Sequence, residues 1–558
     1  MLARRLLLLR IVLLVAFLAF AGKLAYLQLL RGGELRHASV RNQLRWVRSP
    51  APRGVILDRT GAVLATNTPA MAAWLVSGEV ARDRWDALLA RLVAIGIFPD
   101  LQTAAAALAE HRRLPSYLPL RLGSNLTMAQ VTRVEEEGAF LPGIYLRAEP
   151  VRAYPGGALA VHALGYVREI DAEELAARRT DGYRQGDRIG KSGLEKTFEA
   201  ALRGQDGREE VEVDARGSVL RSVRQVPPRE GQTVVLTLHA VLQRAAESAL
   251  AGRKGAVVAL DPRTGDILAL ASAPSYDPTS MSGRLSPESW AWLQRSHALV
   301  NRGLERYPPG SVFKIVTAAA ALETGKAHAG SYFYCPGAYH NIRCWKHAGH
   351  GTLGITAAIA QSCNVAFMHM AEDVGIASLA KMARRFGLGE RTGLEVLPER
   401  RGLVPDAGWA KETGRRWQLG DTLQTGMGQS FLTITPLQGA RLIAAIANGG
   451  KLVTPRLVQQ VGDAVIPTAP PTPIGLQPGT LRGIARGLRA VTHGEGTARG
   501  LDPALRIAGK TGTAQNPGPD HAWFAGYAPA DAPKIAVVVL VEHGGHGGAA
   551  AAPIAEAV

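Results

Sequence analysis

The longest apolar stretch of the chain lies at its start. Residues 6–30 are largely apolar, although the uninterrupted run 11–22 has only 12 residues. That run alone would fit a secretory signal peptide. As one helix, however, residues 6–30 reach about 37 Å, which spans a bilayer core of about 30 Å if Arg10 and Lys23 extend towards the surfaces. We therefore expect residues 1–30 to form a cytoplasmic tip and a single uncleaved transmembrane helix.

The charges beside this segment do not decide its orientation. Arg4, Arg5 and Arg10 suit a cytoplasmic N-terminus, but five arginines follow the segment between residues 31 and 48. Both flanks are basic, so the positive-inside rule would place either one in the cytoplasm and does not fix the orientation.

The next region mixes strand and helix patterns. Two short apolar runs, 55–57 and 63–65, flank turn residues and predict paired strands. Residues 80–140 carry apolar positions at helical spacing, and residues 190–207 begin with turn residues and continue as an amphipathic helix. This part is expected to be an α+β domain.

The pattern changes near residue 230. Residues 232–238 predict a strand and residues 239–252 a helix. Residues 255–272 predict a hairpin, because two apolar runs flank Asp-Pro-Arg-Thr-Gly, and the apolar run 534–542 predicts a buried strand. We expect an α+β domain with helices packed on an antiparallel sheet.

The length of 558 residues also favours more than one domain. The expected division is an anchor (1–30), a non-catalytic domain (31–230) and a second domain (231–558). The net charge of +17 has no nucleic-acid-binding motif beside it, so a nucleic-acid partner is not expected. The three cysteines all lie between residues 335 and 363, which is too few for a disulfide framework.

Ser311 is the candidate nucleophile. Pro308, Pro309 and Gly310 end the preceding loop, and an alanine-rich run predicts a helix that starts at Ser311. Residues three apart share a helix face, so Lys314 is expected beside the Ser311 hydroxyl. Lysine acts as a base only if its pKa falls, and burial and a second cation, Lys510, would both lower it.

Two further motifs complete the candidate site. Ser362 can relay a proton to a leaving amine, and Asn364 can bind a substrate amide. Lys510, Thr511 and Thr513 can hold a terminal carboxylate, while the small Gly512 lets an extended peptide pair with the strand edge. The N–H groups of Ser311 and Thr513 would form the oxyanion site. The motifs are Ser311-Val312-Phe313-Lys314, Ser362-Cys363-Asn364 and Lys510-Thr511-Gly512.

These motifs, in this order, resemble those of the class B penicillin-binding proteins, and within them the elongation-type penicillin-binding protein 2 group. The resemblance runs from the anchor almost to the C-terminus. It rests on RGVILDRTG (53–61), GKSGLEKTFEAALRG (190–204), GAVVALDPRTGDILALAS (255–272), YPPGSVFK (307–314), GMGQSFLTITPLQ (426–438), GKTGTAQ (509–515) and WFAGYAP (523–529). One departure is Ser430, where the family more often has the last glycine of Gly-Gln-Gly.

The resemblance implies a fold and an activity. The fold would be an elongated α+β pedestal followed by a transpeptidase domain with helices around a five-stranded antiparallel sheet. Ser311 would attack the penultimate D-Ala of a peptidoglycan stem peptide, release the terminal D-Ala and pass the acyl group to a neighbouring amine during cell elongation and rod-shape maintenance. A D,D-carboxypeptidase side reaction is also implied, and β-lactams would acylate Ser311.

The resemblance also implies a location and partners. The chain would be a single-pass protein of the inner membrane, with its catalytic domain on the periplasmic side. Its partners would be a membrane-embedded glycosyltransferase of the elongation machinery and other proteins of that complex. No organic cofactor is expected.

The cysteines form a cluster with a histidine. Cys335, Cys344, His350 and Cys363 follow the spacing C-x8-C-x5-H-x12-C, which suits a closed structural zinc site. An extracytoplasmic location alone would instead favour a Cys335–Cys344 disulfide with Cys363 free. Some members of the family bind zinc in this region, so the resemblance favours zinc. His347 is an alternative ligand to His350.

Three other functions share these motifs. They are a septal class B transpeptidase, a β-lactam sensor and a serine β-lactamase. A sensor usually carries several membrane spans, and a secreted β-lactamase does not need about 230 preceding residues. The pedestal segments and the cysteine cluster favour the elongation type over the septal type.

Overall fold

A computed structural model describes residues 2–33, 44–111, 119–213, 219–283 and 285–558. Arg36 and Arg41, two of the arginines beside the anchor, lie outside these ranges. The described chain forms two compact units, and it passes between them several times. Unit 1 contains 1–53, 67–151 and 203–231, and unit 2 contains 54–66, 152–202 and 232–558. The limit between residues 231 and 232 lies beside the domain boundary expected near residue 230. The division of the chain into domains stays a prediction.

The N-terminal segment is helical, as its pattern predicts. Helix α1 (Leu2–Ala25) continues into a π-helical turn, η1 (Tyr26–Leu30). Within the described residues, Ala3–Leu30 is the single helix that is long and apolar enough to cross a membrane, and none of it is buried. An apolar helix with no protein surface against it is consistent with a membrane anchor.

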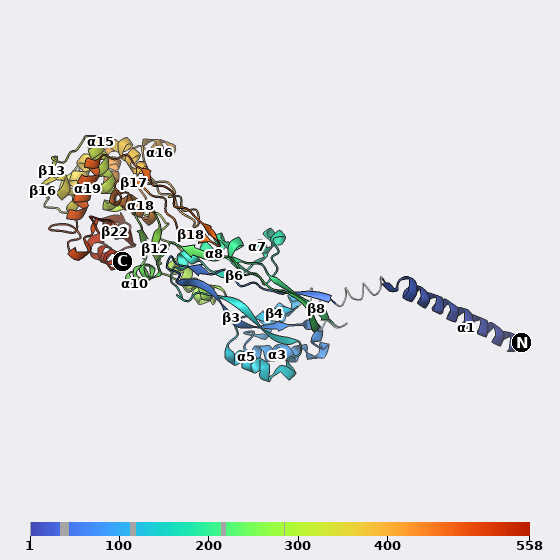
Figure 1. The fold of residues 1–558 in the computed structure, drawn as a ribbon. Coiled ribbons are helices and arrows are strands. Elements are labelled where there is room, and N and C mark those ends of the chain that lie inside the picture. Colours follow the sequence, from blue (N-terminus) through green and yellow to red (C-terminus); the bar gives the residue numbers. More distant parts are fainter. Residues whose placement is uncertain (1, 34–43, 112–118, 214–218, 284) are drawn as a thin grey trace. The chain divides into compact units, whose positions relative to one another are not determined.

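Unit 1 combines antiparallel strands with a layer of helices. Its strands are β1 (Leu44–Ser49), the part of β3 (Val63–Leu75) from Asn67, β4 (Leu120–Gly123), most of β5 (Ile144–Ala153), β8 (Gly207–Val213) and β9 (Val219–Val226). The helices α3 (Trp85–Ile95), α4 (Leu101–His111) and α5 (Met128–Glu136) confirm the helical spacing of residues 80–140. Leu88, Leu92 and Ile95 recur along one face of α3 and are buried there, which explains why α3 packs against its neighbours (Figure 1).

Unit 2 is built on a five-stranded antiparallel sheet in the order β12-β11-β23-β22-β21. The strands are β11 (Gly255–Leu260), β12 (Ile267–Ala273), β21 (Ala508–Asn516), β22 (Gly518–Ala528) and β23 (Ile535–Val541). The hairpin expected over 255–272 and the buried strand expected over 534–542 are therefore confirmed. Strand β21 lies at one edge of the sheet, so one row of its backbone groups has no neighbouring strand.

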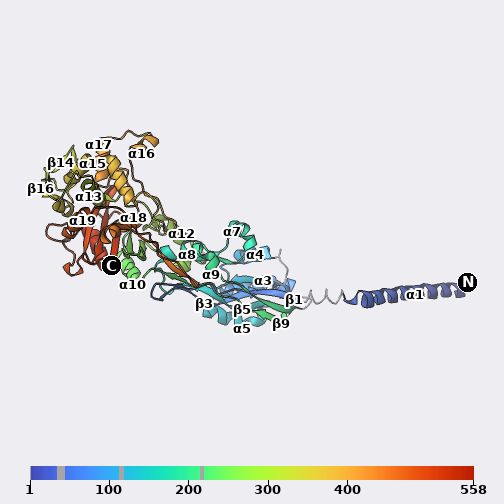
Figure 2. The same cartoon turned by 45° about the horizontal axis from the view of Figure 1, so that its top comes forward.

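Helices surround this sheet, as Figures 1 and 2 show. Helix α18 packs on β11, β22 and β23, while α13 packs on α15, and α14 on α19. The larger helices are α10 (Ala240–Ala249), α12 (Pro287–Ser296), α13 (Lys314–Glu323), α15 (Asn364–Arg385), α17 (Leu419–Gly426), α18 (Pro436–Ala447) and α19 (Pro478–Ala490). The shorter ones include α6 (Val161–Leu164), α7 (Ala172–Ala177), α11 (Pro278–Met281), α14 (Ile355–Ala360), α16 (Ala407–Glu412), α20 (Gly547–Ala550) and α21 (Ala552–Ala557).

Two expected elements differ in detail. The strand expected over 232–238 is β10 (Val234–Leu236), which pairs with β2 (Ile56–Leu57) and β18 (Val458–Val461) rather than with the five-stranded sheet. The amphipathic helix expected within 190–207 is two short helices, α8 (Gly193–Thr197) and α9 (Glu199–Leu202). A buried ion pair at 2.6 Å between Arg152 and Glu195 joins separate parts of this region.

Candidate active site

Ser311 lies on a tight turn rather than at the start of an α-helix. The turn η6 (Gly310–Phe313) is a 3-10 helix, and α13 begins at Lys314, so the helix start expected at Ser311 is wrong by one turn. Gly310 has a φ of +53°, and its N–H donates to Gly428 O at 2.9 Å. A Cβ on Gly310 would lie 2.5 Å from Thr513 O. Only glycine fits here, and its close contacts fix the turn against β21.

Lys314 joins the first motif to the second. Its side chain is fully buried, and its Nζ donates to Ser362 O at 2.8 Å and to Asn364 Oδ1 at 2.7 Å. Ser362 Oγ lies 3.3 Å from the same nitrogen. The hydrogen bonds recorded for Nζ within the described residues all go to this motif, and none goes to Ser311. The ammonium is thus oriented by the residues that would relay a proton.

Burial dominates the charge state of both lysines. It lowers the pKa of Lys314 to about 8, although the Cys363 and Cys344 sulfurs act in the opposite direction. Lys510 is also fully buried, and burial, followed by the charge of Lys314, holds its pKa well below the usual range. A pKa near 8 leaves an appreciable fraction of Lys314 as the neutral amine that a general base requires.

Ser362 adopts an uncommon backbone conformation. Its φ is +53°, in the left-handed region that side chains disfavour. The indole Nε1 of Trp345 donates to Gln361 O at 3.1 Å and to Ser362 O at 3.2 Å. Asn364 Nδ2 donates to Arg343 O at 3.4 Å. Trp345 was not a candidate site residue, although it lies between Cys344 and His350, in the segment that carries the cysteine cluster.

The third motif lies on the edge strand β21. Lys510 Nζ donates to Thr511 O at 3.0 Å, and Thr511 Oγ1 lies 2.6 Å from Thr497 Oγ1. A Cβ on Gly512 would lie 2.8 Å from Trp523 Cβ and 3.0 Å from Pro309 O. Glycine is therefore needed at this position for packing against β22 and the loop before Ser311. This requirement is separate from the expected approach of a peptide.

A side-chain amide covers part of this strand edge. Gln429 Nε2 donates to Thr513 O at 3.2 Å, and Gln515 N donates to Gln429 Oε1 at 3.3 Å. The next residue, Ser430, has a φ of +63°. Glycine adopts this left-handed conformation without strain, which explains the glycine expected here from the Gly-Gln-Gly motif. The serine at position 430 therefore has a conformational cost. Gln429 was missed because a lone glutamine in a loop carries no chemical signal.

The cysteine cluster is assembled next to the second motif. Cys335 ends β13 (Tyr332–Cys335), and Cys363 caps the N-terminus of α15. The ligand atoms of Cys335, Cys344, His350 and Cys363 all lie within 4.8 Å of one another, whereas His347 is not part of this group. The three cysteines are free, without a Cys335–Cys344 disulfide.

The distances in this cluster fit a tetrahedral metal site. His350 Nδ1 lies 3.5 Å from Cys335 Sγ and 3.6 Å from Cys344 Sγ. Bonds of about 2.3 Å from zinc to sulfur and about 2.05 Å to nitrogen put two tetrahedral ligands about 3.6 Å apart. Cys363 donates a hydrogen bond to the Cys344 sulfur, which lowers the pKa of Cys344 and raises the pKa of Cys363. A thiolate is the form in which cysteine binds metals.

A helix-covered five-stranded sheet with these three motifs at its edge defines the class of penicillin-binding serine enzymes. Two family models match the chain. They are the "Penicillin binding protein transpeptidase domain" over residues 255–558 and the "Penicillin-binding Protein dimerisation domain" over residues 48–236. The chain therefore belongs to the penicillin-binding proteins, in the elongation-type group of penicillin-binding protein 2.

Individual relatives agree with this assignment. Peptidoglycan D,D-transpeptidase MrdA of Acinetobacter baumannii is 34% identical over 96% of this chain and 84% of its own length. MrdA of Escherichia coli K12 is 32% identical, with 96% and 91% covered. A solved structure of penicillin-binding protein 2 with MreC from Helicobacter pylori has a TM-score of 0.78 and 30% identity, and covers 92% of this chain and 98% of its own. A structure from a peptidoglycan synthase complex has a TM-score of 0.73 and 33% identity, with 99% and 97% covered. The comparisons favour the elongation group over the septal group.

Proposed function

We propose that this chain cross-links peptidoglycan as a D,D-transpeptidase through an acyl-enzyme on Ser311. The observation that carries the mechanism is the buried Lys314, whose lowered pKa and contacts with Ser362 and Asn364 make it the base of the site. Its neutral amine accepts the Ser311 hydroxyl proton while Oγ attacks the carbonyl carbon of the penultimate D-Ala. The backbone N–H groups of Ser311 and Thr513 stabilise the resulting oxyanion.

The remaining steps return the enzyme to its starting state. The C–N bond to the terminal D-Ala breaks, and the departing amine takes a proton from Lys314 through Ser362. An amine of a neighbouring stem peptide then attacks the Ser311 ester, forms the new amide and returns the proton to Oγ. Thr511 and Thr513 hold the donor carboxylate beside the buried Lys510, and Gly512 keeps the strand edge accessible to the peptide.

Labelling with a fluorescent penicillin tests this assignment directly. A β-lactam mimics the donor, so Ser311→Ala should abolish covalent labelling while Ser280→Ala, at an exposed position of the same unit, keeps it. Mass spectrometry of the intact wild-type protein should show one added penicillin. Persistent labelling of the Ser311 variant would assign the nucleophile elsewhere, and rapid release of hydrolysed penicillin would favour a β-lactamase.

We also propose zinc at Cys335, Cys344, His350 and Cys363. The 3.5 Å and 3.6 Å separations of its sulfur and nitrogen atoms support this site. A bound zinc would supply a structural cross-link between the loop 335–350 and the N-terminus of α15, and no catalytic step passes through it. Elemental analysis should find about one zinc per chain, and Cys363→Ser should lower that ratio. Absence of zinc together with oxidised Cys335 and Cys344 would contradict the proposal.

The proposed location is the inner membrane, with one span and with unit 2 on the periplasmic side. The chemistry supports this orientation because peptidoglycan lies outside the cytoplasmic membrane. Proposed partners are a membrane-embedded glycosyltransferase and other elongation-complex proteins. Their support is that the similar structures come from a complex with MreC and from a peptidoglycan synthase complex. Protease digestion of intact spheroplasts should remove unit 2, and its protection there would refute the orientation.

A further inference from the structure

Helix α19 carries a row of arginines on its exposed face. Arg482, Arg486 and Arg489 are all exposed. At 100° and 1.5 Å per residue, they occupy about 60° of the helix circumference and rise about 10 Å along it. The opposite face is buried and contains Thr480, Ile484, Gly487 and Leu488. The arginines are therefore gathered on one side of a helix whose other side is fixed in the core.

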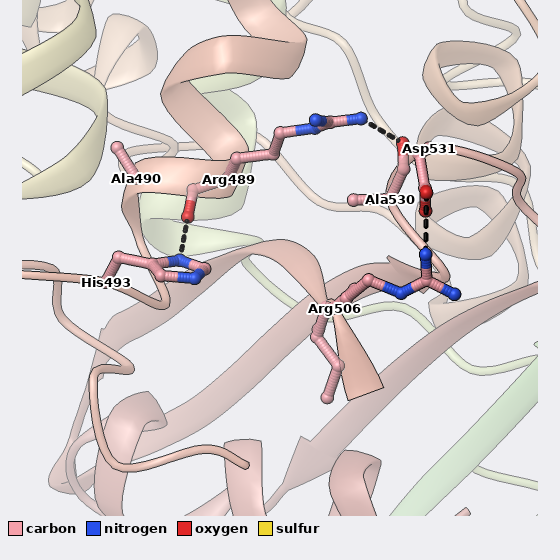
Figure 3. A pocket seen from close by; sticks show the side chains of 7 residues that line it. Arg489, Ala490, His493, Arg506, Ala530 and Asp531 are labelled. Carbon is pink, nitrogen blue, oxygen red and sulfur yellow. Dashed lines mark hydrogen bonds and ion pairs between the residues drawn. The ribbon is translucent and has the colours of Figure 1, made fainter. Parts of the chain in front are cut away.

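A cavity of about 440 Å³ lies at the C-terminal end of this row (Figure 3). Arg489 Nη2 donates to Ala530 O at 2.8 Å, and Arg506 Nη1 pairs with Asp531 Oδ2 at 2.7 Å. A guanidinium has five N–H donors, so most of these donors remain available to a ligand. The lining residues are Arg489, Ala490, His493, Arg506, Ile507, Ala530 and Asp531.

The charge of this surface is strongly positive. Asp531 is the acidic residue of the cavity lining, which also contains two arginines, and it pairs with Arg506. Arg482 and Arg486 have no recorded side-chain hydrogen bond or ion pair within the described residues. Guanidinium groups without acidic partners, aligned beside a cavity, attract anions and suit the planar geometry of carboxylates.

The cavity is connected to the catalytic strand. Its wall includes Ile507, whose carbonyl accepts a hydrogen bond from Thr492 Oγ1 at 2.9 Å. Ile507 lies three residues before Lys510, or about 10 Å along an extended strand. Arg506 has a φ of +49°, a left-handed conformation that costs about 1 kcal/mol or more. Such strain is retained where the surrounding structure holds a residue in a required position.

We propose that this α19 surface, formed by Arg482, Arg486, Arg489, His493 and Arg506, binds carboxylates of a peptidoglycan strand other than the donor acylated at Ser311. The inference rests on the proposed function, which supplies a polymer whose stem peptides end in carboxylates. Arginine pairs with such groups through two parallel hydrogen bonds. A peptidoglycan strand bound here would lie next to the N-terminal end of β21. The surface would therefore keep the polymer beside the catalytic site between turnovers.

Retention on purified peptidoglycan tests the proposal. We expect the full-length protein in detergent to bind peptidoglycan less well as salt rises, because surface charge pairs are screened. Arg482→Gln/Arg486→Gln/Arg489→Gln should weaken retention about tenfold at low salt, with penicillin labelling unchanged. The matched control is Arg253→Gln/Arg295→Gln/Arg416→Gln, which removes three exposed arginines elsewhere in unit 2 and should bind like the wild type. Arg486→Glu alone should also weaken retention, which covers the case of a poorly folded triple variant.

Two further arms identify the ligand. Peptidoglycan whose carboxylates have been converted to amides should lose the difference between wild type and triple variant, whereas vesicles of anionic phospholipid should not reproduce it. Equal retention of both proteins on untreated peptidoglycan would overturn the inference, as would a difference that survives amidation or appears only with vesicles. A wild-type protein that penicillin does not label would instead refute the proposed function.

Discussion

Ser430 adopts a backbone conformation that its side chain makes costly. Its φ of +63° lies in the left-handed region, where a Cβ approaches the following carbonyl oxygen. Gly428, two residues earlier, has a φ of +86°, and a Cβ there would lie 1.8 Å from Gly310 O. The loop therefore tolerates a side chain at 430 with strain, but it excludes one at 428.

Ser430→Gly should stabilise the protein by about 0.5–1 kcal/mol, because glycine adopts this φ without the Cβ conflict and loses only part of that gain to its greater freedom when unfolded. Denaturant unfolding followed by circular dichroism measures the change. The control Ser289→Gly lies in the first turn of helix α12 and should destabilise by about 0.5 kcal/mol. Destabilisation of similar size at both positions would contradict the explanation.

Lys314 should give acylation a defined pH dependence. Its pKa is lowered to about 8, so the neutral amine increases as pH rises through 8. The rate of penicillin acylation should therefore rise between about pH 7 and 9 and then level off. Stopped-flow measurement of acylation gives this profile.

Removing the amine tests the same assignment. Lys314→Ala should reduce acylation by about 10²- to 10⁴-fold, the usual contribution of a general base. Lys326→Ala, at an exposed position just beyond α13, should leave both rate and profile unchanged. A wild-type rate that is constant from pH 6 to 9 would exclude Lys314 as the group that titrates.

Among the elements, the loop that contains Trp345 acts on the second motif through backbone carbonyls. The indole N–H bonds to Gln361 O and Ser362 O, and Ser362 O also accepts from Lys314. The loop and the first residue of α13 thus both donate to one carbonyl oxygen. This arrangement explains how the left-handed Ser362 is kept in place.

Trp345→Phe removes these two hydrogen bonds and keeps an aromatic ring. Unfolding free energy should fall by no more than about 1–2 kcal/mol, since the indole is 56% exposed. Penicillin acylation should slow by about tenfold, because the proton relay becomes less well positioned. The control Trp290→Phe, on α12, should change neither quantity appreciably. A loss of stability without any loss of acylation rate would show that Trp345 serves packing alone.

At the scale of the whole molecule, the N-terminal helix and the two compact units need different surroundings. The helix Ala3–Leu30 has no buried residue, so the full chain exposes a long apolar surface that needs lipid or detergent. Both compact units have buried cores of their own. No described residue of this helix belongs to either core, so we expect the helix to contribute membrane attachment rather than folding energy.

Removal of residues 1–33 should yield a protein that stays in solution without detergent and still reacts with penicillin. Ultracentrifugation and fluorescent labelling of the supernatant measure the two properties. The full-length chain prepared in parallel should sediment when detergent is removed. A truncated protein that aggregates, or that is soluble but unlabelled, would show that the anchor is needed for the fold of unit 2.

The sequence by itself determined the local elements and the chemistry available to them. The anchor, the hairpin at 255–272 and the strand at 534–542 follow from runs and periods of apolar residues, because such patterns specify which face of a segment is buried. The three motifs could be found in the same way, since their residue types and spacing are local. The spacing of the cysteines and His350 suggested a cluster, but on the residues alone a Cys335–Cys344 disulfide was favoured over zinc.

Only the tertiary structure decided which distant residues meet. It pairs β10 with β2 and β18, because a short apolar strand does not encode its partner. It also turns the Lys314 ammonium to Ser362 and Asn364, gathers the four metal-ligand candidates, and brings Trp345 and Gln429 to the site. The arginines of α19 and Arg506 share one surface for the same reason. Contacts between residues far apart in sequence depend on how whole elements pack, and no local pattern contains that information.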